Sequence, residues 1–419
     1  MTDGTLDLVL RHGALPDGRQ NIDIGILGAR IVAVEPALAA KGRSERDCTG
    51  KLISPPFVDA HFHLDSTLTA GLPRRNESGT LLEGIAIWGE LKPQLTQDAI
   101  VARALRYCEL AAQQGLLAIR SHVDVCDPRL IAVEALLDVK RRVKDLIDLQ
   151  LVAFPQDGYY RSPIAVACLT RALEMGVEVV GGIPHFERTT ADGTASVRAL
   201  CTLGAERGLM IDLHCDETDD PMSRHVETLA AETVRLGLQG RVVASHVTSM
   251  HSMDNYYVSK LLPLLAEAGL GVIANPLINI VLQGRHDFYP KRRGLTRVPE
   301  LQDAGVPVAF GQDCMMDPWY PLGTADMLDV AHMALHVAQL TSLTGMRSCF
   351  TAITEIPARL LGLEGYGLRP GNFADLIVLD AQDPIDAIQR RPLRSLVVRR
   401  GRIISECRMD RTIRPALPH

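Results

Sequence analysis

The chain has 419 residues, of which 47% are hydrophobic and 22% charged, with 44 Lys and Arg against 50 Asp and Glu. The apolar content is sufficient for a large core and excludes a mostly disordered chain. The nearly balanced charge excludes the basic surface expected of a nucleic-acid-binding protein. Nine cysteines are dispersed without a C-x-x-C pair, no apolar run reaches 18 residues, and the N-terminus lacks a positive signal-peptide region. We therefore expect a soluble cytoplasmic protein with reduced thiols, and neither a nucleic acid nor a membrane as partner.

The first 50 residues alternate between apolar and polar positions in short pieces. Turn residues interrupt them at Gly13, at 16–18 and at Gly28. This pattern is typical of short antiparallel strands, so we expect β structure over 6–50.

The middle of the chain repeats one unit eight times. Each unit has a short apolar run rich in β-branched residues, followed by a segment such as 97–114 or 222–237 with helical spacing. This repetition predicts a (β/α)₈ TIM barrel of the α/β class. A doubly wound open sheet would normally carry a Gly-rich phosphate loop after its first strand, and the sequence has none. The predicted strands are 52–61, 116–124, 147–154, 178–186, 209–217, 241–247, 271–277 and 306–314.

The C-terminal segment returns to short alternating pieces between 366 and 407, with turns at 370–371 and 400–401. We expect these strands and those of the N-terminal segment to form one small β domain. The predicted organisation is therefore a β domain built from 1–55 and 365–419, with the barrel at 56–364.

Potential metal ligands stand at the carboxyl ends of the predicted barrel strands, where the active sites of such barrels lie. His61 and His63 are two residues apart and project from the same face of the first strand. His214 on the fifth strand and Asp313 on the eighth complete a set of nitrogen and oxygen donors typical of Zn²⁺ or Fe²⁺. An open coordination position would hold a water whose pKa the metal lowers to about 7.

Long segments across the barrel resemble the amidohydrolase superfamily and, within it, the bacterial cytosine deaminase group. The family fold, a (β/α)₈ barrel with a small β domain formed by both termini, agrees with the strand pattern. The matching segments are 55–67 (PPFVDAHFHLDST), 78–84 (SGTLLEG), 121–125 (SHVDV), 149–158 (LQLVAFPQDG), 179–187 (VVGGIPHFE), 212–220 (DLHCDETDD), 244–252 (ASHVTSMHS), 274–294 (ANPLINIVLQGRHDFYPKRRG) and 317–328 (DPWYPLGTADML).

The resemblance implies a hydrolytic deaminase of an amino-substituted nitrogen heterocycle, with one divalent metal per subunit and a homo-oligomeric assembly. A metal-bound hydroxide would attack the amino-bearing carbon and release ammonia. Its ligands would be His61, His63, His214 and Asp313.

The resemblance also implies roles for residues around that metal. Glu217 would protonate the ring nitrogen, as a carboxylic acid with a raised pKa can. His246 would stabilise the developing charge, and Asp313 would pass the water's proton to the leaving amine. Gln156 and the Leu81 backbone would read the amide edge of the substrate, with His185 as a further pocket residue.

The end of the eighth strand departs from the family pattern. Cytosine deaminases typically have two consecutive acids there, whereas this chain has Asp313 followed by Cys314. Because an unmatched polar group costs about 1–3 kcal/mol, Cys314 and the nearby Met316 point to a changed substrate pocket. A larger ring such as isoguanine, a pterin or an s-triazine is therefore a second hypothesis beside cytosine.

Three further alternatives come from the same comparison. Removal of an N-alkylamine from an s-triazine uses similar ligands. Relatives with two metals bridge them with a carboxylated Lys on the fourth strand, which is absent from 179–186, so the sequence favours one metal. A non-catalytic scaffold would usually have lost metal ligands that are all present here.

Overall fold

The computed structural model describes residues 5–410, and these fall into two units. One unit is Pro56–Tyr366, and the other joins the described parts of 1–55 and 367–419. The outermost residues of the predicted β domain, 1–4 and 411–419, lie outside the described residues. We propose that the two units are the two domains of the chain. Within residues 5–410, no helix combines the length and apolar character needed to cross a bilayer.

The larger unit contains the predicted parallel barrel. Eight strands pair in chain order, and a parallel bridge between Phe62 and Asp313 brings the last strand to the first. Most strands are buried along their whole length, because helices cover the outside of the sheet. The strands are β6 (Phe57–Phe62), β7 (Leu116–Asp124), β8 (Asp148–Phe154), β9 (Val179–Gly182), β10 (Met210–Cys215), β11 (Val242–His246), β12 (Gly271–Ala274) and β13 (Val308–Phe310).

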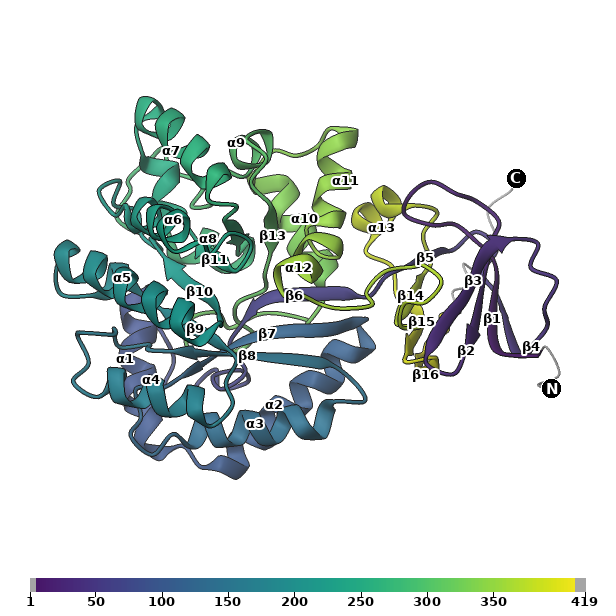
Figure 1. The fold of residues 1–419 in the computed structure, drawn as a ribbon, viewed down its shortest axis with the longest axis horizontal. Helices are drawn as coiled ribbons and strands as arrows, with labels where there is room; N and C mark the ends of the chain where they lie inside the picture. The colour runs from purple at the N-terminus through teal and green to yellow at the C-terminus, as the bar shows by residue number, and fades with distance from the viewer. Residues whose placement is uncertain (1–4, 411–419) are drawn as a thin grey trace, which may run out of the picture. The chain divides into compact units, whose positions relative to one another are not determined.

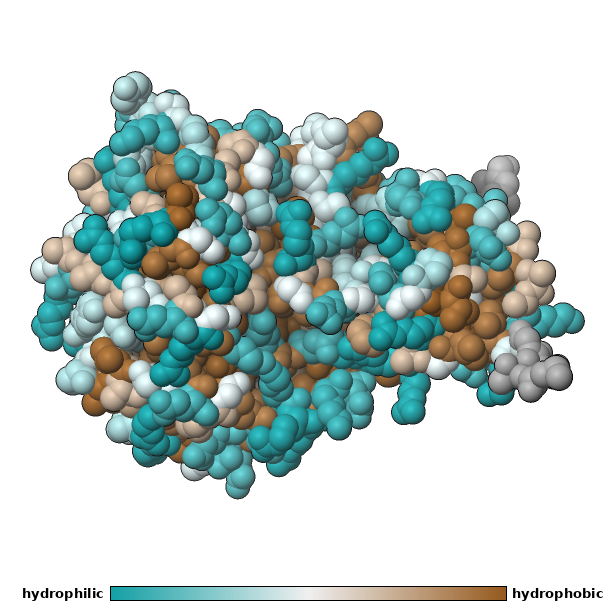
Figure 2. All heavy atoms as spheres, viewed as in Figure 1, coloured by the Kyte–Doolittle hydropathy of each residue, from teal (hydrophilic) through white to brown (hydrophobic). Residues whose placement is uncertain are grey.

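Helices connect these strands and surround the sheet (Figure 1). Their boundaries follow local signals: the Thr96 and Thr189 side chains cap two N-termini, and Gly208 ends a helix at φ 67°. Hydrophilic side chains cover much of the face in Figure 2. The helices are α1 (Leu81–Leu91), α2 (Gln97–Gln113), α3 (Ile131–Val143), α4 (Ala165–Glu174), α5 (Thr190–Arg207), α6 (His225–Leu236), α7 (Asn255–Glu267), α8 (Pro276–Leu282), α9 (Val298–Asp303), α10 (Met327–Val337), α11 (Leu343–Thr351) and α12 (Glu355–Leu360), with 3₁₀ turns η1 (Lys92–Gln94), η2 (Pro184–Phe186) and η3 (Thr248–Ser252).

The smaller unit contains two four-stranded sheets around one apolar core. The first sheet is wholly N-terminal, whereas the second joins three C-terminal strands to one N-terminal strand through the antiparallel pair β14–β5. The predicted β domain from both termini is thus confirmed, and it contains two sheets. Its elements are β1 (Leu6–Gly13), β2 (Ile22–Leu27), β3 (Arg30–Pro36), β4 (Gly42–Asp47), β5 (Leu52–Ser54), β14 (Leu376–Leu379), α13 (Pro384–Arg390), β15 (Arg394–Arg399) and β16 (Arg402–Glu406).

The first predicted barrel strand, 52–61, is divided in the structure. Residues 52–54 form β5 in the small unit, and β6 of the barrel begins at Phe57. Pro55 and Pro56 separate the two, and because proline has no N–H it cannot donate to a sheet ladder. One continuous apolar run therefore supplies a strand to each unit.

Candidate active site and metal centre

Two backbone hydrogen bonds between β6 and the chain after β13 position the first ligands. The Asp313 N–H donates to the His61 carbonyl at 2.8 Å, and the His63 N–H donates to the Asp313 carbonyl at 3.1 Å. This exchange places the Asp313 carboxylate beside both imidazoles. Its Oδ1 lies 3.3 Å from the Nε2 atoms of His61 and His63.

The predicted ligands from four places in the sequence converge in one buried cluster. His214 on β10 brings its Nε2 atom to 3.0 Å from that of His63. His61, His214, His246 and Asp313 also form a group whose potential ligand atoms all lie within 4.8 Å of one another. Nitrogen and oxygen donors at this spacing have the composition of a zinc or non-haem iron site.

The pKa shifts of His214 and Asp313 favour the charge states that bind a metal cation. Burial lowers the pKa of His214 well below its ordinary value, and the neighbouring His61 adds to this effect. Burial opposes ionisation of Asp313, but His61 and His63 outweigh it and hold the pKa of that carboxyl well below its usual range. The Nε2 atom of His61 is buried without a hydrogen-bond partner among residues 5–410. Burial also lowers the pKa of His63, but the Asp313 carboxylate outweighs it and raises that pKa above its ordinary value. The neutral imidazole favoured at His214 and the ionised carboxylate favoured at Asp313 are the forms that bind divalent metals.

Glu217 follows β10 in a turn that directs its side chain into the same site. Asp216 adopts φ 54°, and its carboxylate accepts a hydrogen bond at 3.0 Å from the His225 N–H at the start of α6. Burial, followed by the Asp313 charge, raises the pKa of Glu217 well above its ordinary value. Its Oε1 atom lies 3.5 Å from His246 Nδ1. The raised pKa favours the protonated carboxyl of Glu217, the form that can donate a proton.

His246, at the end of β11, is held as one neutral tautomer. The Asn279 side-chain oxygen accepts a hydrogen bond from the Asn275 backbone N–H. The Asn279 side-chain nitrogen therefore faces His246 Nδ1, at 3.0 Å. Nδ1 accepts this bond, which leaves the proton on Nε2. Burial lowers the pKa of His246 well below its ordinary value, so the ring stays neutral. The Nε2–H group lies 3.8 Å from Asp313 Oδ2 and is directed into the site.

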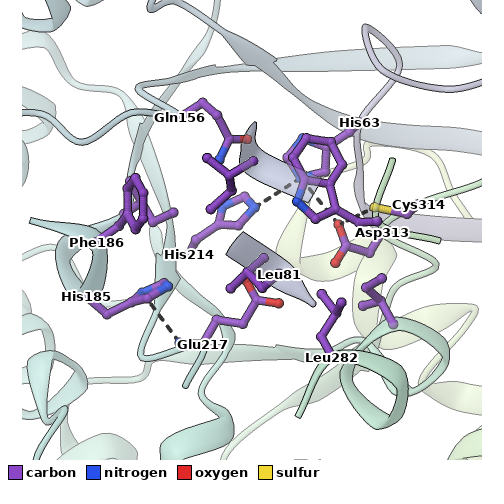
Figure 3. A pocket seen from close by; sticks show the side chains of 14 residues that line it. His63, Leu81, Gln156, His185, Phe186, His214, Glu217, Leu282, Asp313 and Cys314 are labelled. Carbon is purple, nitrogen blue, oxygen red and sulfur yellow. Dashed lines mark hydrogen bonds and ion pairs between the residues drawn. The ribbon is translucent and has the colours of Figure 1, made fainter. Parts of the chain in front are cut away.

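A pocket opens above the cluster, with apolar walls and a polar floor (Figure 3). Of the residues predicted to bind substrate, Leu81, Gln156, His185 and Cys314 line it. Met316 is absent from the lining residues, and 39% of its surface is exposed. The other lining residues are His63, Ile85, Ile183, Phe186, His214, Glu217, Ile278, Leu282, Asp313 and Trp319.

One cluster residue was not predicted from the sequence. His122 on β7 is fully buried, with its ring centroid 4.2 Å from that of His61, and it forms a potential ligand group with His61, His63 and His214. Its place near the carboxyl end of the second barrel strand was the available signal. Asn275 and Asn279 were missed because they act through His246 rather than on a metal.

An ion network, with Lys92 and Asp124 buried and Asp157 partly exposed, fixes α1, which forms one wall of the pocket. Lys92 Nζ lies 2.8 Å from Asp124 Oδ2 and 2.7 Å from Asp157 Oδ2, and Trp88 Nε1 donates to the same Asp124 oxygen. The network ties the end of α1 to β7 and to the residue after Gln156. The two walls that carry Leu81 and Gln156 are therefore held together.

Comparisons with known proteins identify the family of the chain. A family model described as "Amidohydrolase family" matches residues 44–405. The structure of 5-methylcytosine deaminase from Klebsiella pneumoniae has a TM-score of 0.94 and 41% identity, covering 97% of this chain and 99% of that one. N-isopropylammelide isopropyl amidohydrolase of Pseudomonas sp. (strain ADP) is 30% identical over 95% of this chain and 97% of its own length. Pterin deaminase of Rhizobium rhizogenes is 30% identical over 95% of this chain and 91% of its own length.

We predict that His214→Ala abolishes stoichiometric metal binding, because it removes a central imidazole of the cluster. Metal content per chain, measured by mass spectrometry of the purified protein, should fall to roughly a tenth or less of the unchanged protein's. The matched control is His12→Ala in the smaller unit, whose side chain is 57% exposed. Equal metal content in both variants would contradict this assignment.

Proposed function

Because the chain belongs to the amidohydrolase family, we propose that it is a metal-dependent hydrolytic deaminase of an amino-substituted, cytosine-like heterocycle. The reaction replaces the ring C–NH₂ group with C=O, consumes water and releases ammonia. The observation that carries the proposal is that Glu217 and Asp313 line the same pocket as His63 and His214, with the pKa of Glu217 raised and that of Asp313 lowered.

The protein groups supply two different proton-transfer functions. Glu217, whose pKa is raised by burial, donates a proton to the ring nitrogen next to the amino-bearing carbon and regains one from the attacking oxygen when the C=O group forms. The Asp313 carboxylate accepts a proton from the attacking water and passes it to the leaving amine. The Nε2–H group of His246 donates to the oxygen that becomes negatively charged at the carbon.

The metal would be held by His61, His63, His214 and Asp313. When bound, it supplies Lewis acidity and lowers the pKa of the attacking water. The mixed donors suit Zn²⁺ and Fe²⁺, and we propose one such ion per subunit. The homo-oligomeric assembly implied by the family resemblance stays a prediction.

The pocket walls suit a flat heterocycle. Phe186, Leu282 and Trp319 supply apolar surface for the ring faces, and the Gln156 amide offers both a donor and an acceptor to a ring edge. Gln156 has 7% of its surface exposed. A substrate edge with complementary polar atoms would therefore bind better than an apolar one.

Cys314 favours a ring with an apolar substituent. Its thiol is buried beside Asp313, and burial, followed by the Asp313 charge, raises the pKa of the thiol well above its ordinary value. The group is thus small, neutral and weakly polar, unlike the second acid of cytosine deaminases. A methyl group gains about 0.8 kcal/mol on burial against such a surface. Together with the likeness to 5-methylcytosine deaminase, this supports 5-methylcytosine as the preferred substrate over cytosine.

A second candidate function is removal of an N-alkylamine from an s-triazine. It is favoured by the 30% identity to N-isopropylammelide isopropyl amidohydrolase across nearly the whole chain. The chemistry also breaks a C–N bond at a ring carbon. The leaving group is an alkylamine, which needs more space than ammonia.

We expect metal-loaded protein to release ammonia from 5-methylcytosine faster than from cytosine, isoguanine, a pterin or an amino-s-triazine. Ammonia release should be measured together with metal content, and isopropylamine release should be measured from N-isopropylammelide. Faster isopropylamine release would establish the second candidate. No turnover of any ring by the metal-loaded protein would contradict the proposed deaminase.

We expect Glu217→Gln to lower kcat/KM for ammonia release by about 10²–10⁴-fold, because the amide cannot supply the ring proton. Metal content should remain unchanged, since Glu217 is not among the proposed ligands. Glu206→Gln on the exposed face of α5 is the matched control. A variant retaining more than about a tenth of the activity would argue against Glu217 as the proton donor.

We expect Cys314→Asp to reduce the preference for 5-methylcytosine over cytosine by about 10-fold or more, within the range one methyl group can discriminate. The new carboxylate would be poorly matched to a methyl group and better matched to polar ring atoms. The ratio of the two kcat/KM values is the measurement, with Cys407→Asp at an exposed cysteine as control. An unchanged ratio would show that Cys314 does not select the substituent.

A further inference from the structure

A chain of buried hydrogen bonds leads away from His61 on the side opposite the pocket. His61 Nδ1 lies 2.9 Å from the Ser245 hydroxyl oxygen, and that hydroxyl donates to Asp212 Oδ1 at 2.7 Å. All three residues have no exposed surface. The chain crosses from β6 to β11 and then to β10, so it connects three barrel strands beneath the site.

The direction of each hydrogen bond follows from proton counting. Arg120 Nη1 lies 2.9 Å from Asp212 Oδ2, and both side chains are fully buried. Because a buried guanidinium needs a negatively charged partner, Asp212 must be ionised. An ionised Asp212 has no proton to donate, and the Ser245 hydroxyl therefore gives it its single proton. Ser245 can then only accept from His61, which places the ring proton on Nδ1.

This assignment determines which nitrogen of His61 is available to a metal. With the proton on Nδ1, the Nε2 lone pair is free and faces Asp313 Oδ1 at 3.3 Å. In the other tautomer, the metal-facing nitrogen would carry a proton and could not bind. The Ser245 bond also restricts rotation of the imidazole ring about its Cβ–Cγ axis.

We propose that Ser245 is a positioning residue that locks His61 as the Nδ1–H tautomer for metal binding, with Asp212 and Arg120 fixing the direction of the bond. The proposal rests on the metal centre of the proposed function and is independent of the substrate. Groups of this kind typically change metal affinity by about 10–100-fold when removed. A purely structural role would change the stability of the protein without a specific loss of metal affinity.

The first test compares Ser245→Ala with Ser196→Ala in competition with a chelator of known zinc affinity. Ser196 is also fully buried, but its hydroxyl donates to the Gly193 carbonyl within α5. We expect Ser245→Ala to bind Zn²⁺ about 10–100-fold more weakly than the unchanged protein and Ser196→Ala to bind it within about threefold. Equal zinc affinity of the two variants would overturn the positioning role of Ser245. Failure of the unchanged protein to bind zinc or iron would instead overturn the proposed metal centre.

The second test needs no metal and observes the unchanged protein. Nitrogen-15 NMR of the metal-free, unchanged protein with labelled histidine rings reports which nitrogen of each ring is protonated, and comparison with the spectrum of His61→Asn identifies the His61 signal. We expect protonation at Nδ1 and a lone pair at Nε2. Protonation at Nε2 with a free Nδ1 would overturn the proposal, even if the protein deaminates its substrate.

Discussion

The site depends on how the last barrel strand meets the first. β13 ends at Phe310, and the chain beyond it is held by the reciprocal hydrogen bonds between Asp313 and the two histidines of β6. Asp313 adopts φ 68°, a conformation that costs a non-glycine residue about 1–3 kcal/mol. Barrel closure offsets this strain and directs the carboxylate at His61 and His63. The proposed metal centre therefore depends on barrel closure, which brings Asp313 to His61 and His63.

Burial opposes ionisation of both acids of the site, but their charged neighbours act in opposite directions. Asp313 contacts imidazoles that favour its charge, whereas Glu217 has Asp313 as its main charged neighbour, which disfavours a second negative charge. Ionisation is thus favoured for Asp313 and disfavoured for Glu217 in the same pocket. A base and an acid are both available at neutral pH because their environments move the two pKa values apart.

The features predicted from the sequence were those with local patterns. Alternating and β-branched runs located the strands, and spacing at strand ends located His61 and His63. The domain limit at 55–56 was predicted, but the division of the predicted strand 52–61 into β5 and β6 was missed, because one apolar run serves two sheets. His122 was missed because a lone histidine has no local partner, and Met316 was expected in the pocket only for its proximity to Cys314. The misses at His122 and Met316 both concern the direction of a side chain, which depends on tertiary packing.

Metal binding and ring selection involve different parts of the barrel. The chain from His61 to Arg120 is enclosed by strands and has no contact with solvent. Cys314 and Leu81 lie on the loop after β13 and at the start of α1, outside the strands. A buried ion pair contributes little to stability relative to apolar packing, so Arg120 is better explained by the charge it maintains on Asp212. Substitutions in the pocket wall can thus change the preferred ring while the ligand tautomers remain fixed.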